Sequence, residues 1–307
     1  MAILLGDVGG TNARFAIGRN GVIDAATVTR YRGDDFQTFD SVVSRFLQDQ
    51  GQPRITSACI AVAGPVSGGR AVLTNRDWDM SEDGLARLTD ADNVRLINDL
   101  TALGYATASL QGDGLRVLRE APIDRARNGQ SLVVGLGTGF NVCSVRALPG
   151  GGIAAMEAEE GHTQLPANIY RRLVDLLGAE AADRFFSTEE LFAGRGLSHL
   201  HAARTRGVPA RGEDIARAAE SGETEAVATY DLFTDLVGLL CRELTMRFMP
   251  LDGLFLAGSV GRSIADRMER FKKTFLAEPY MRHTPDNTPV FLILDDMAAL
   301  QGCLAAL

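Results

Sequence analysis

The sequence contains two short glycine-rich turns, and each lies between two stretches with the pattern of β-strands. In the first, the apolar residues 2–6 lead through GDVGGTN into residues 13–18, which alternate with a period of two. In the second, residues 131–135 lead through LGTGF into residues 141–147. The nucleotide loops GxxxxGK[ST] and GxGxxG both need a helix directly after the glycines, so the sequence excludes them here.

The two turns indicate a weak internal repeat within an α/β chain. Apolar residues at helical or strand spacing fill the remainder of the sequence. Helices are predicted around 39–47, 101–110, 169–177, 229–249 and 264–275, and strands at 59–64, at 94–98 and within 251–262. The regular alternation of strands and helices predicts an α/β fold.

Length and composition favour a two-domain protein that binds small molecules. The chain has 307 residues, of which 46% are hydrophobic, and a net charge of 31 − 39 = −8. The acidic balance and the lack of Lys/Arg blocks argue against a nucleic-acid or acidic-lipid partner. No apolar run reaches the roughly 20 residues of a membrane helix. The cysteines are far apart without a CxxC pair, which predicts reduced thiols and a cytoplasmic location.

Asp7 distinguishes the first turn from the second. Two equivalent turns would let two sets of backbone N–H groups bind one polyphosphate, but Leu136 stands where the second turn would carry a carboxylate. A carboxylate beside phosphates needs a cation between them, so Asp7 is the predicted anchor for Mg²⁺. The alternative is that Gly9 and Gly10 form a plain hairpin and Asp7 caps it.

Asp99 follows the buried strand at 94–98, and ligands of open α/β sheets bind beyond the carboxyl ends of strands. A carboxylate in that place can accept the proton of an attacking hydroxyl, as in phosphoryl transfer to an alcohol. The alternative is an N-cap for a helix that starts at Thr101, which is a common role for Asp and Asn.

The segment EAEEGH, residues 157–162, combines carboxylates with an imidazole and therefore suits several sugar hydroxyls. Such acidic runs are also common on solvated surfaces. His199 and His201 are two residues apart in a predicted helix, face different sides and are interpreted as structural. The sequence has no GxSxG elbow and no cysteine in an activating motif.

Seven segments together resemble the bacterial glucokinase family. They are GDVGGTNARF, AVAGPVSG, LTNRDW, INDLTA, GLGTGF, EEGH and LAGSVGR, in the family's order and at about its separations. The resemblance implies an actin-like, hexokinase-type fold with duplicated ribonuclease-H-like domains around a cleft. Its expected domains are 1–108 with 296–307, and 109–295. It further implies ATP and Mg²⁺ as cofactors, a hexose as substrate, and a homodimer.

The resemblance also implies roles for individual residues. Asp99 matches the catalytic base. The sugar ligands it implies are Asn98, Asp99, Glu159, His162 and Glu189, with Asn75 close to the sugar pocket. The phosphates would lie near Asp7, Gly9, Gly10, Thr11, Asn12, Gly137, Thr138 and Gly139, and the adenosine near Gly258 and Ser259.

Three positions depart from the family's pattern. Asn141 replaces a glycine after the second turn, where Asn would tolerate a left-handed backbone. Glu160 replaces the first glycine of EGGH and is expected beside the sugar ligands. Ser259 replaces a glycine near the adenosine. The in-class alternative is a kinase for another hexose or an amino sugar. Outside the class, a non-catalytic sugar or nucleotide sensor remains, whereas an actin-like ATPase leaves EEGH and Glu189 unexplained.

Overall fold

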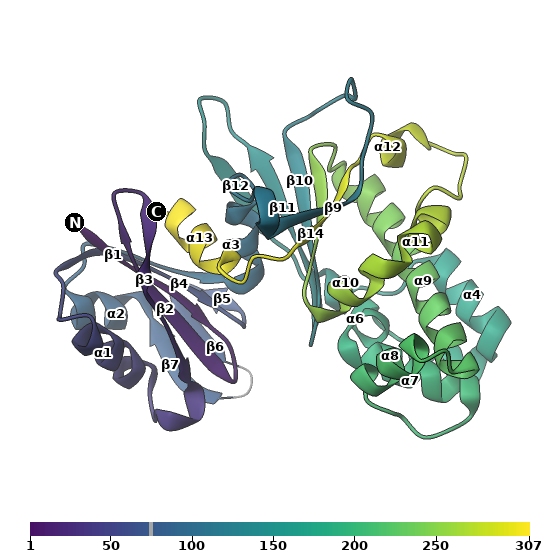
Figure 1. The fold of residues 1–307 in the computed structure, drawn as a ribbon, viewed down its shortest axis with the longest axis horizontal. Helices are drawn as coiled ribbons and strands as arrows, with labels where there is room; N and C mark the ends of the chain where they lie inside the picture. The colour runs from purple at the N-terminus through teal and green to yellow at the C-terminus, as the bar shows by residue number, and fades with distance from the viewer. Residues whose placement is uncertain (74–75) are drawn as a thin grey trace. The chain divides into compact units, whose positions relative to one another are not determined.

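The computed structural model describes residues 1–73 and 76–307, which form two compact units (Figure 1). Unit 1 contains residues 1–114 and 295–307, and unit 2 contains residues 115–294. The sequence-based borders are 108/109 and 295/296. In the structure the first unit also includes the 3₁₀ turn η2 Gly112–Gly114, because Asp295 N–H donates to the Gly114 carbonyl at 3.2 Å.

Unit 1 is built on a mixed sheet with the strand order β3-β2-β1-β4-β8. Its strands are β1 Ala2–Val8, β2 Asn12–Arg19, β3 Val22–Arg32, β4 Ile55–Val62 and β8 Asn93–Asn98. The first three pair antiparallel, whereas β1, β4 and β8 run parallel, so the carboxyl ends of these three meet at one edge. A small antiparallel sheet, β5 Val66–Ser67, β6 Arg70–Leu73 and β7 Arg76–Ser81, lies beside it.

Helices cover both faces of this sheet. Apolar residues of α1 Phe39–Asp49 and α2 Glu82–Thr89 form the core on one face, and those of α3 Asp99–Ala106 and α13 Ala298–Ala305 form the core on the other. The C-terminal helix α13 packs tightly on α3, since a Cβ at Gly302 would collide with the Ala102 carbonyl. The end of the chain thus completes unit 1.

Unit 2 repeats this strand arrangement in a sheet of order β12-β11-β10-β13-β14-β9. Its strands are β9 Leu115–Arg119, β10 Gln130–Leu136, β11 Phe140–Ala147, β12 Ile153–Glu157, β13 Gly253–Ala257 and β14 Val290–Ile293. Strands β10 to β12 are antiparallel and β10, β13 and β14 are parallel. Both units therefore contain the predicted strand, glycine turn and strand, followed by parallel neighbours.

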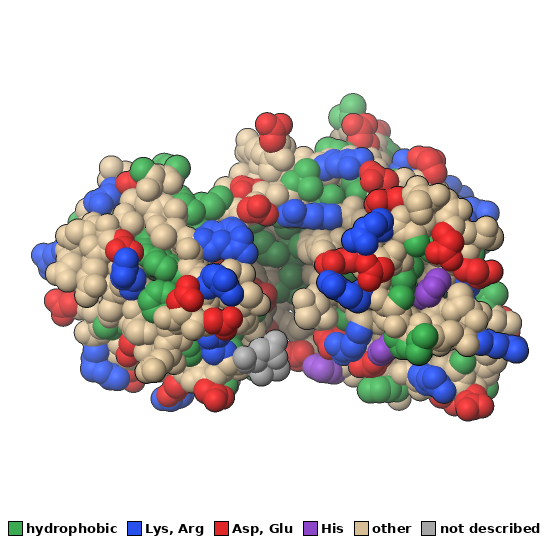
Figure 2. All heavy atoms as spheres, turned by 60° about the horizontal axis from the view of Figure 1, so that its bottom comes forward, with side chains coloured by type: hydrophobic (Ala, Val, Ile, Leu, Met, Phe, Trp, Pro, Cys, Tyr) green, Lys and Arg blue, Asp and Glu red, His purple; other side chains and the backbone are tan. Residues whose placement is uncertain are grey.

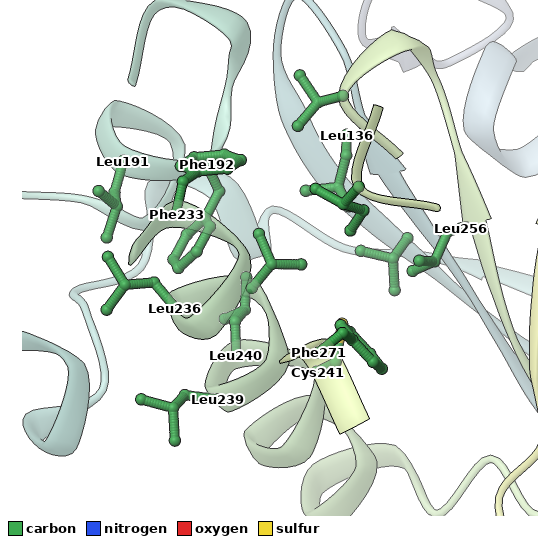
Figure 3. Close-up of a cluster of buried hydrophobic side chains, with 14 of the residues drawn as sticks. Leu136, Leu191, Phe192, Phe233, Leu236, Leu239, Leu240, Cys241, Leu256 and Phe271 are labelled. Carbon is green, nitrogen blue, oxygen red and sulfur yellow. The ribbon is translucent and has the colours of Figure 1, made fainter. Parts of the chain in front are cut away.

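The helices of unit 2 surround the long helix α9 Thr224–Phe248. The others are α4 Ala167–Leu177, α5 Ala179–Ala182, α6 Thr188–Phe192, α7 Gly194–Thr205, α8 Gly212–Glu220, α10 Ser259–Ile264, α11 Met268–Phe275 and α12 His283–Asp286. Figure 3 shows Phe233, Leu236 and Leu240 of α9 in the core with Leu136 of β10 and Phe271 of α11. This core holds the carboxyl end of β10, at Leu136, where the second glycine turn starts.

Two predicted helices differ in extent. Helix α3 ends at Ala106, not at residue 110, because the hydroxyls of Thr107 and Ser109 donate to the carbonyls of Gly104 and Ala106. The segment predicted as a helix around 264–275 contains the last residue of α10, then the 3₁₀ turn η4 Ala265–Arg267, and the α-helix α11 begins only at Met268.

On the face in Figure 2, acidic and basic side chains are interspersed on each unit. None of the described helices combines the length and the hydropathy that a bilayer crossing demands.

Candidate active site

Unit 1 contains a cavity of about 300 Å³ at the carboxyl ends of its parallel strands. The cavity is lined by Asp7, Gly9, Thr11, Asn12, Arg14, Arg30, Ala63 and Asp99. Asp7 precedes the last residue of β1, Ala63 follows β4, and Asp99 follows β8. The sheet therefore brings together residues far apart in the sequence, at the edge where α/β proteins bind ligands.

The first helical turn of α3 separates the roles of Asn98 and Asp99. Asn98 is the N-cap, because its Oδ1 accepts from Leu100 N–H at 2.9 Å while its Nδ2 donates to the Gly64 carbonyl at 3.1 Å. Asp99 is the first helical residue, and its Oδ1 accepts from the same N–H at 2.8 Å. The cap considered for Asp99 thus belongs to Asn98, and α3 begins two positions before Thr101.

The surroundings of Asp99 raise the pKa of its carboxyl group toward neutral pH. The pKa of Asp99 is raised to about 6, chiefly by burial; the hydrogen bond from Leu100 N–H opposes this rise and the negative charge of Asp7 contributes to it. A carboxylate with a pKa near the working pH is well suited to accept a proton from a hydroxyl.

Asp7 shares its face of the sheet with two arginines. It lies directly across from Arg14 in β2, and Arg14 lies directly across from Arg30 in β3. Burial raises the pKa of Asp7, and the charges of Arg14 and Arg30 oppose that rise. Neither arginine was identified from the sequence, although alternation with a period of two in both strands puts such residues on one face.

The first turn leaves backbone donors unused. Gly9 N–H bonds to the Asn12 carbonyl at 2.9 Å, and the Thr11 carbonyl accepts from Gly33 N–H at 2.9 Å. Within the described residues, the N–H groups of Gly10 and Thr11 have no hydrogen-bond partner. Free N–H groups on successive residues form an anion-binding nest. Asn12, predicted within the turn, begins β2 instead.

The second turn also leaves backbone donors unused. Gly137 N–H bonds to the Gly139 carbonyl at 3.0 Å, and the N–H groups of Thr138 and Gly139 have no hydrogen-bond partner in the part of the chain that the structure describes. Gly258 adopts φ +92°, and a Cβ there would collide with the Leu136 carbonyl. Gly258 and Ser259, the start of α10, therefore adjoin this turn.

Three predicted sugar ligands also belong to unit 2. Glu159 and His162 are exposed, with Oε2 and Nε2 3.8 Å apart. Glu189 of α6 accepts from Phe140 N–H at 3.1 Å through Oε2 and from Arg195 at 2.8 Å through Oε1. Burial acts against ionisation, but the hydrogen bonds from Arg195 and Phe140 hold the pKa of Glu189 below its usual value. Arg195 was not identified from the sequence.

Asn141 and Glu160, the two departures from the family pattern near these ligands, are joined by a hydrogen bond. Asn141 is a regular β11 residue outside the left-handed region, so the tolerance of Asn for a left-handed backbone is not needed here. Its Oδ1 accepts from Glu160 N–H at 3.0 Å, and its Nδ2 donates to the Ala158 carbonyl at 2.6 Å and to Glu159 Oε2 at 3.4 Å.

Glu160 itself is buried and forms an ion pair with Arg247 of α9. Its carboxylate therefore points into unit 2 toward α9 and is paired with Arg247, whereas Glu159 and His162 are exposed. The side chain is retained inside the protein because the ion pair compensates part of the cost of burying a carboxylate.

The remaining predictions divide between the units. Unit 1 brings together Asp7, Gly9, Gly10, Thr11, Asn12, Asn98 and Asp99, and unit 2 brings together Gly137, Thr138, Gly139, Gly258, Ser259, Glu159, His162 and Glu189. Asn75 lies outside the described residues.

Asp7 is suited to a metal ion that is bound by only one or two protein side chains. Within residues 1–73 and 76–307, no group of three or more His, Cys, Asp or Glu side chains gathers to hold a metal ion by itself. Mg²⁺ in kinases is bound by one or two carboxylates and by substrate phosphates, so Asp7 beside a phosphate nest is a suitable donor for it.

Comparison with solved structures indicates the class of sugar kinases. The chain superposes with a TM-score of 0.86 on a glucokinase from an Antarctic psychrotroph, at 29% identity and covering 100% of this chain and 98% of that one. A glucokinase of the ROK family from Streptomyces griseus, solved in complex with glucose and AMPPNP, has a TM-score of 0.62 at 18% identity, covering 99% and 98%.

Sequence comparison gives the family. The glucokinase family model matches residues 4–307. A glucokinase of Caulobacter vibrioides is 31% identical over 322 aligned positions, which cover 99% of this chain and 94% of the relative. The chain belongs to the glucokinase family, whose activity is the ATP-dependent phosphorylation of glucose.

Proposed function

We propose that Asp99 is the general base of this kinase and accepts the proton of the glucose 6-hydroxyl as that oxygen attacks the γ-phosphorus of ATP. The observation that carries the proposal is the Asp99 carboxylate, with a pKa of about 6, in the cavity formed with the first glycine turn. The new O–P bond forms as the bond to the leaving ADP oxygen breaks, and ADP leaves with that electron pair.

The phosphates of ATP bind to the backbone donors of both turns in this proposal. Gly10 and Thr11 offer free N–H groups in unit 1, and Thr138 and Gly139 offer them in unit 2. Asp7 would be the protein's donor to Mg²⁺, and that ion would supply positive charge next to the phosphates. Gly258 and Ser259 would contact the adenosine.

The sugar binds to Asn98, Glu159, His162 and Glu189 in this proposal, with Asn75 close by. Glu189 suits a sugar hydroxyl because its lowered pKa keeps it ionised and able to accept a hydrogen bond. The reported complex of the Streptomyces griseus enzyme with glucose and AMPPNP supports the pairing of a hexose with a nucleotide on this fold.

We also propose a homodimer that works in the cytoplasm. The four cysteines are buried and unbridged, which suits a reducing compartment. Sedimentation of the purified protein tests the dimer, and a mass of a single 32.9 kDa chain at all concentrations would rule it out.

The test of the activity is the initial rate of ADP production with Mg-ATP and one sugar at a time: glucose, fructose, mannose, galactose, glucosamine or N-acetylglucosamine. We expect turnover with glucose far above the others. A higher rate with another sugar would assign the chain to the in-class alternative. ATP and glucose binding without turnover on any sugar would indicate a sensor and refute the proposal.

A further inference from the structure

Three charged side chains form a row across the antiparallel part of the unit 1 sheet. Asp7 in β1, Arg14 in β2 and Arg30 in β3 are direct cross-strand partners in register. Directly opposite residues project to the same face of a sheet. All three also line the 300 Å³ cavity that contains Asp99 and the first glycine turn.

The two arginines of this row are like charges on directly opposite residues. Like charges directly opposite on neighbouring strands destabilise a sheet. The Arg14 guanidinium is engaged elsewhere, because its Nη1 donates to the carbonyl of Asp296. Arg30 has neither a hydrogen bond nor an ion pair with any described residue. The only charge that faces it from β1 is the more distant Asp7.

An anion in the cavity removes this repulsion. Guanidinium groups bind phosphate oxygens through paired N–H donors, whereas a neutral sugar gains little from a positive charge. The free N–H groups of Gly10 and Thr11 lie in the adjoining turn and select for the same chemistry. Arg30, Gly10 and Thr11 therefore complement a ligand with several phosphate oxygens.

We infer that Arg30 is a nucleotide-binding residue that contacts the terminal phosphates of ATP. The inference rests on the proposed function, because it assumes that the cavity beside Asp99 receives the phosphates. It assigns different roles to the two arginines: Arg14 fixes the segment before α13 to β2, and Arg30 is free to engage the ligand.

The test measures binding of ATP and of inorganic tripolyphosphate, without sugar, to the full chain and to Arg30→Gln. We expect affinity for both probes to fall by about 10- to 100-fold, because one charge-assisted contact is lost. Tripolyphosphate has no base, so a parallel loss assigns the contact to phosphate. Arg30→Lys should recover part of the affinity.

Two comparisons exclude a merely structural effect. Arg45→Gln, on the exposed side of α1 and paired with Asp49, is the matched loss of one arginine and should bind both probes as the wild type does. Without ligand, Arg30→Gln should unfold at a higher temperature than the wild type, because the repulsion with Arg14 is gone. With ATP, its gain in unfolding temperature should be smaller.

The outcomes separate this inference from the proposed function. Unchanged affinity of Arg30→Gln for both probes would overturn the inference, even if the enzyme phosphorylates glucose normally. Weakened phosphate binding in a protein that phosphorylates no sugar would support the inference and refute the proposed function. Loss of ATP binding with normal tripolyphosphate binding would place Arg30 near the base or ribose and also overturn the inference.

Discussion

The two glycine turns have the same length, and each leaves two successive N–H groups without partners among the described residues, but their surroundings differ. Around the first, Asp7, Arg14, Arg30 and Asp99 line a cavity. Around the second, the structural counterpart of Asp7 is Gly135 and not, as the sequence had suggested, Leu136, because Gly135 lies opposite Asn141 as Asp7 lies opposite Arg14. Leu136 is buried in the core of unit 2 (Figure 3), as Val8 is in unit 1. Repetition of the strand–turn–strand unit therefore supplies backbone donors twice, whereas two aspartates and two arginines line a cavity beside the first turn and the ion-paired Glu189 lies beside the second.

The polar groups near the second turn are bonded to each other. Asn141 bonds to Glu159 and to the Glu160 backbone, and Glu189 accepts from Phe140 and Arg195. In unit 1, by contrast, Asp7 and Asp99 both have raised pKa values, and Arg30 lacks a partner among the described residues. We interpret the first turn as the reactive side and the second as a preorganised binding side.

The largest expected effect is that of Asp99→Asn. The amide cannot take up the proton of the sugar hydroxyl, so kcat should fall by about 10²–10⁴-fold. Glucose affinity, measured by calorimetry, should change little because the amide occupies the same space. Asp92→Asn, an exposed residue of unit 1, serves as the control. A variant that keeps most of its activity would contradict the assignment of Asp99 as base.

The pH profile gives the next largest effect. Protonated Asp99 cannot act as a base, so kcat/KM should fall about tenfold per pH unit below the pKa of about 6 and level off above it. Because the charge of Asp7 contributes to the raised pKa, Asp7→Asn should move the inflection to lower pH in addition to its effect on Mg²⁺ dependence. An inflection that stays in place would show that the two carboxylates are not coupled.

The raised pKa of Asp99 also predicts an effect on stability: Asp99→Asn should lower the activity but raise the free energy of unfolding. Since the folded-state pKa of Asp99 is raised, folding is favoured when this group is protonated, and that contribution is lost as the pH rises through about 6. Asp99→Asn should therefore raise the free energy of unfolding by about 1–3 kcal/mol near neutral pH. Denaturant titration below about pH 3, where wild-type Asp99 is largely protonated in both states, should show little difference. If Asp99→Asn were less stable than the wild type at neutral pH, the expectation that ionised Asp99 destabilises the folded protein would be contradicted.

The sequence predicted the parts of this structure that depend on local patterns. Period-two alternation and glycine spacing identified β1, β2, β10 and β11, and the apolar strand before INDL placed Asp99 at the sheet edge. What it missed depends on cross-strand register and side-chain direction. The row from Asp7 to Arg30 needs the pairing of three strands, and the inward direction of Glu160 needs Arg247, which lies 87 positions later (247 − 160) on α9.

The smallest predicted effect is that of a substitution at Asn141. It tests the interpretation of the second turn as a preorganised binding side. Asn141→Ala removes the bonds to Ala158, Glu159 and Glu160 N–H without moving any group of unit 1. Each neutral bond contributes about 0.5–1.5 kcal/mol, so loss of one or two near the sugar ligands should raise the glucose KM by roughly 3- to 30-fold. Because Asp99 is unaffected, kcat and the pH inflection should remain those of the wild type. Ser144→Ala on the same strand β11 is the control. An equal loss of kcat would mean that the second turn takes part in the reactive side, and the division between the two turns would then fail.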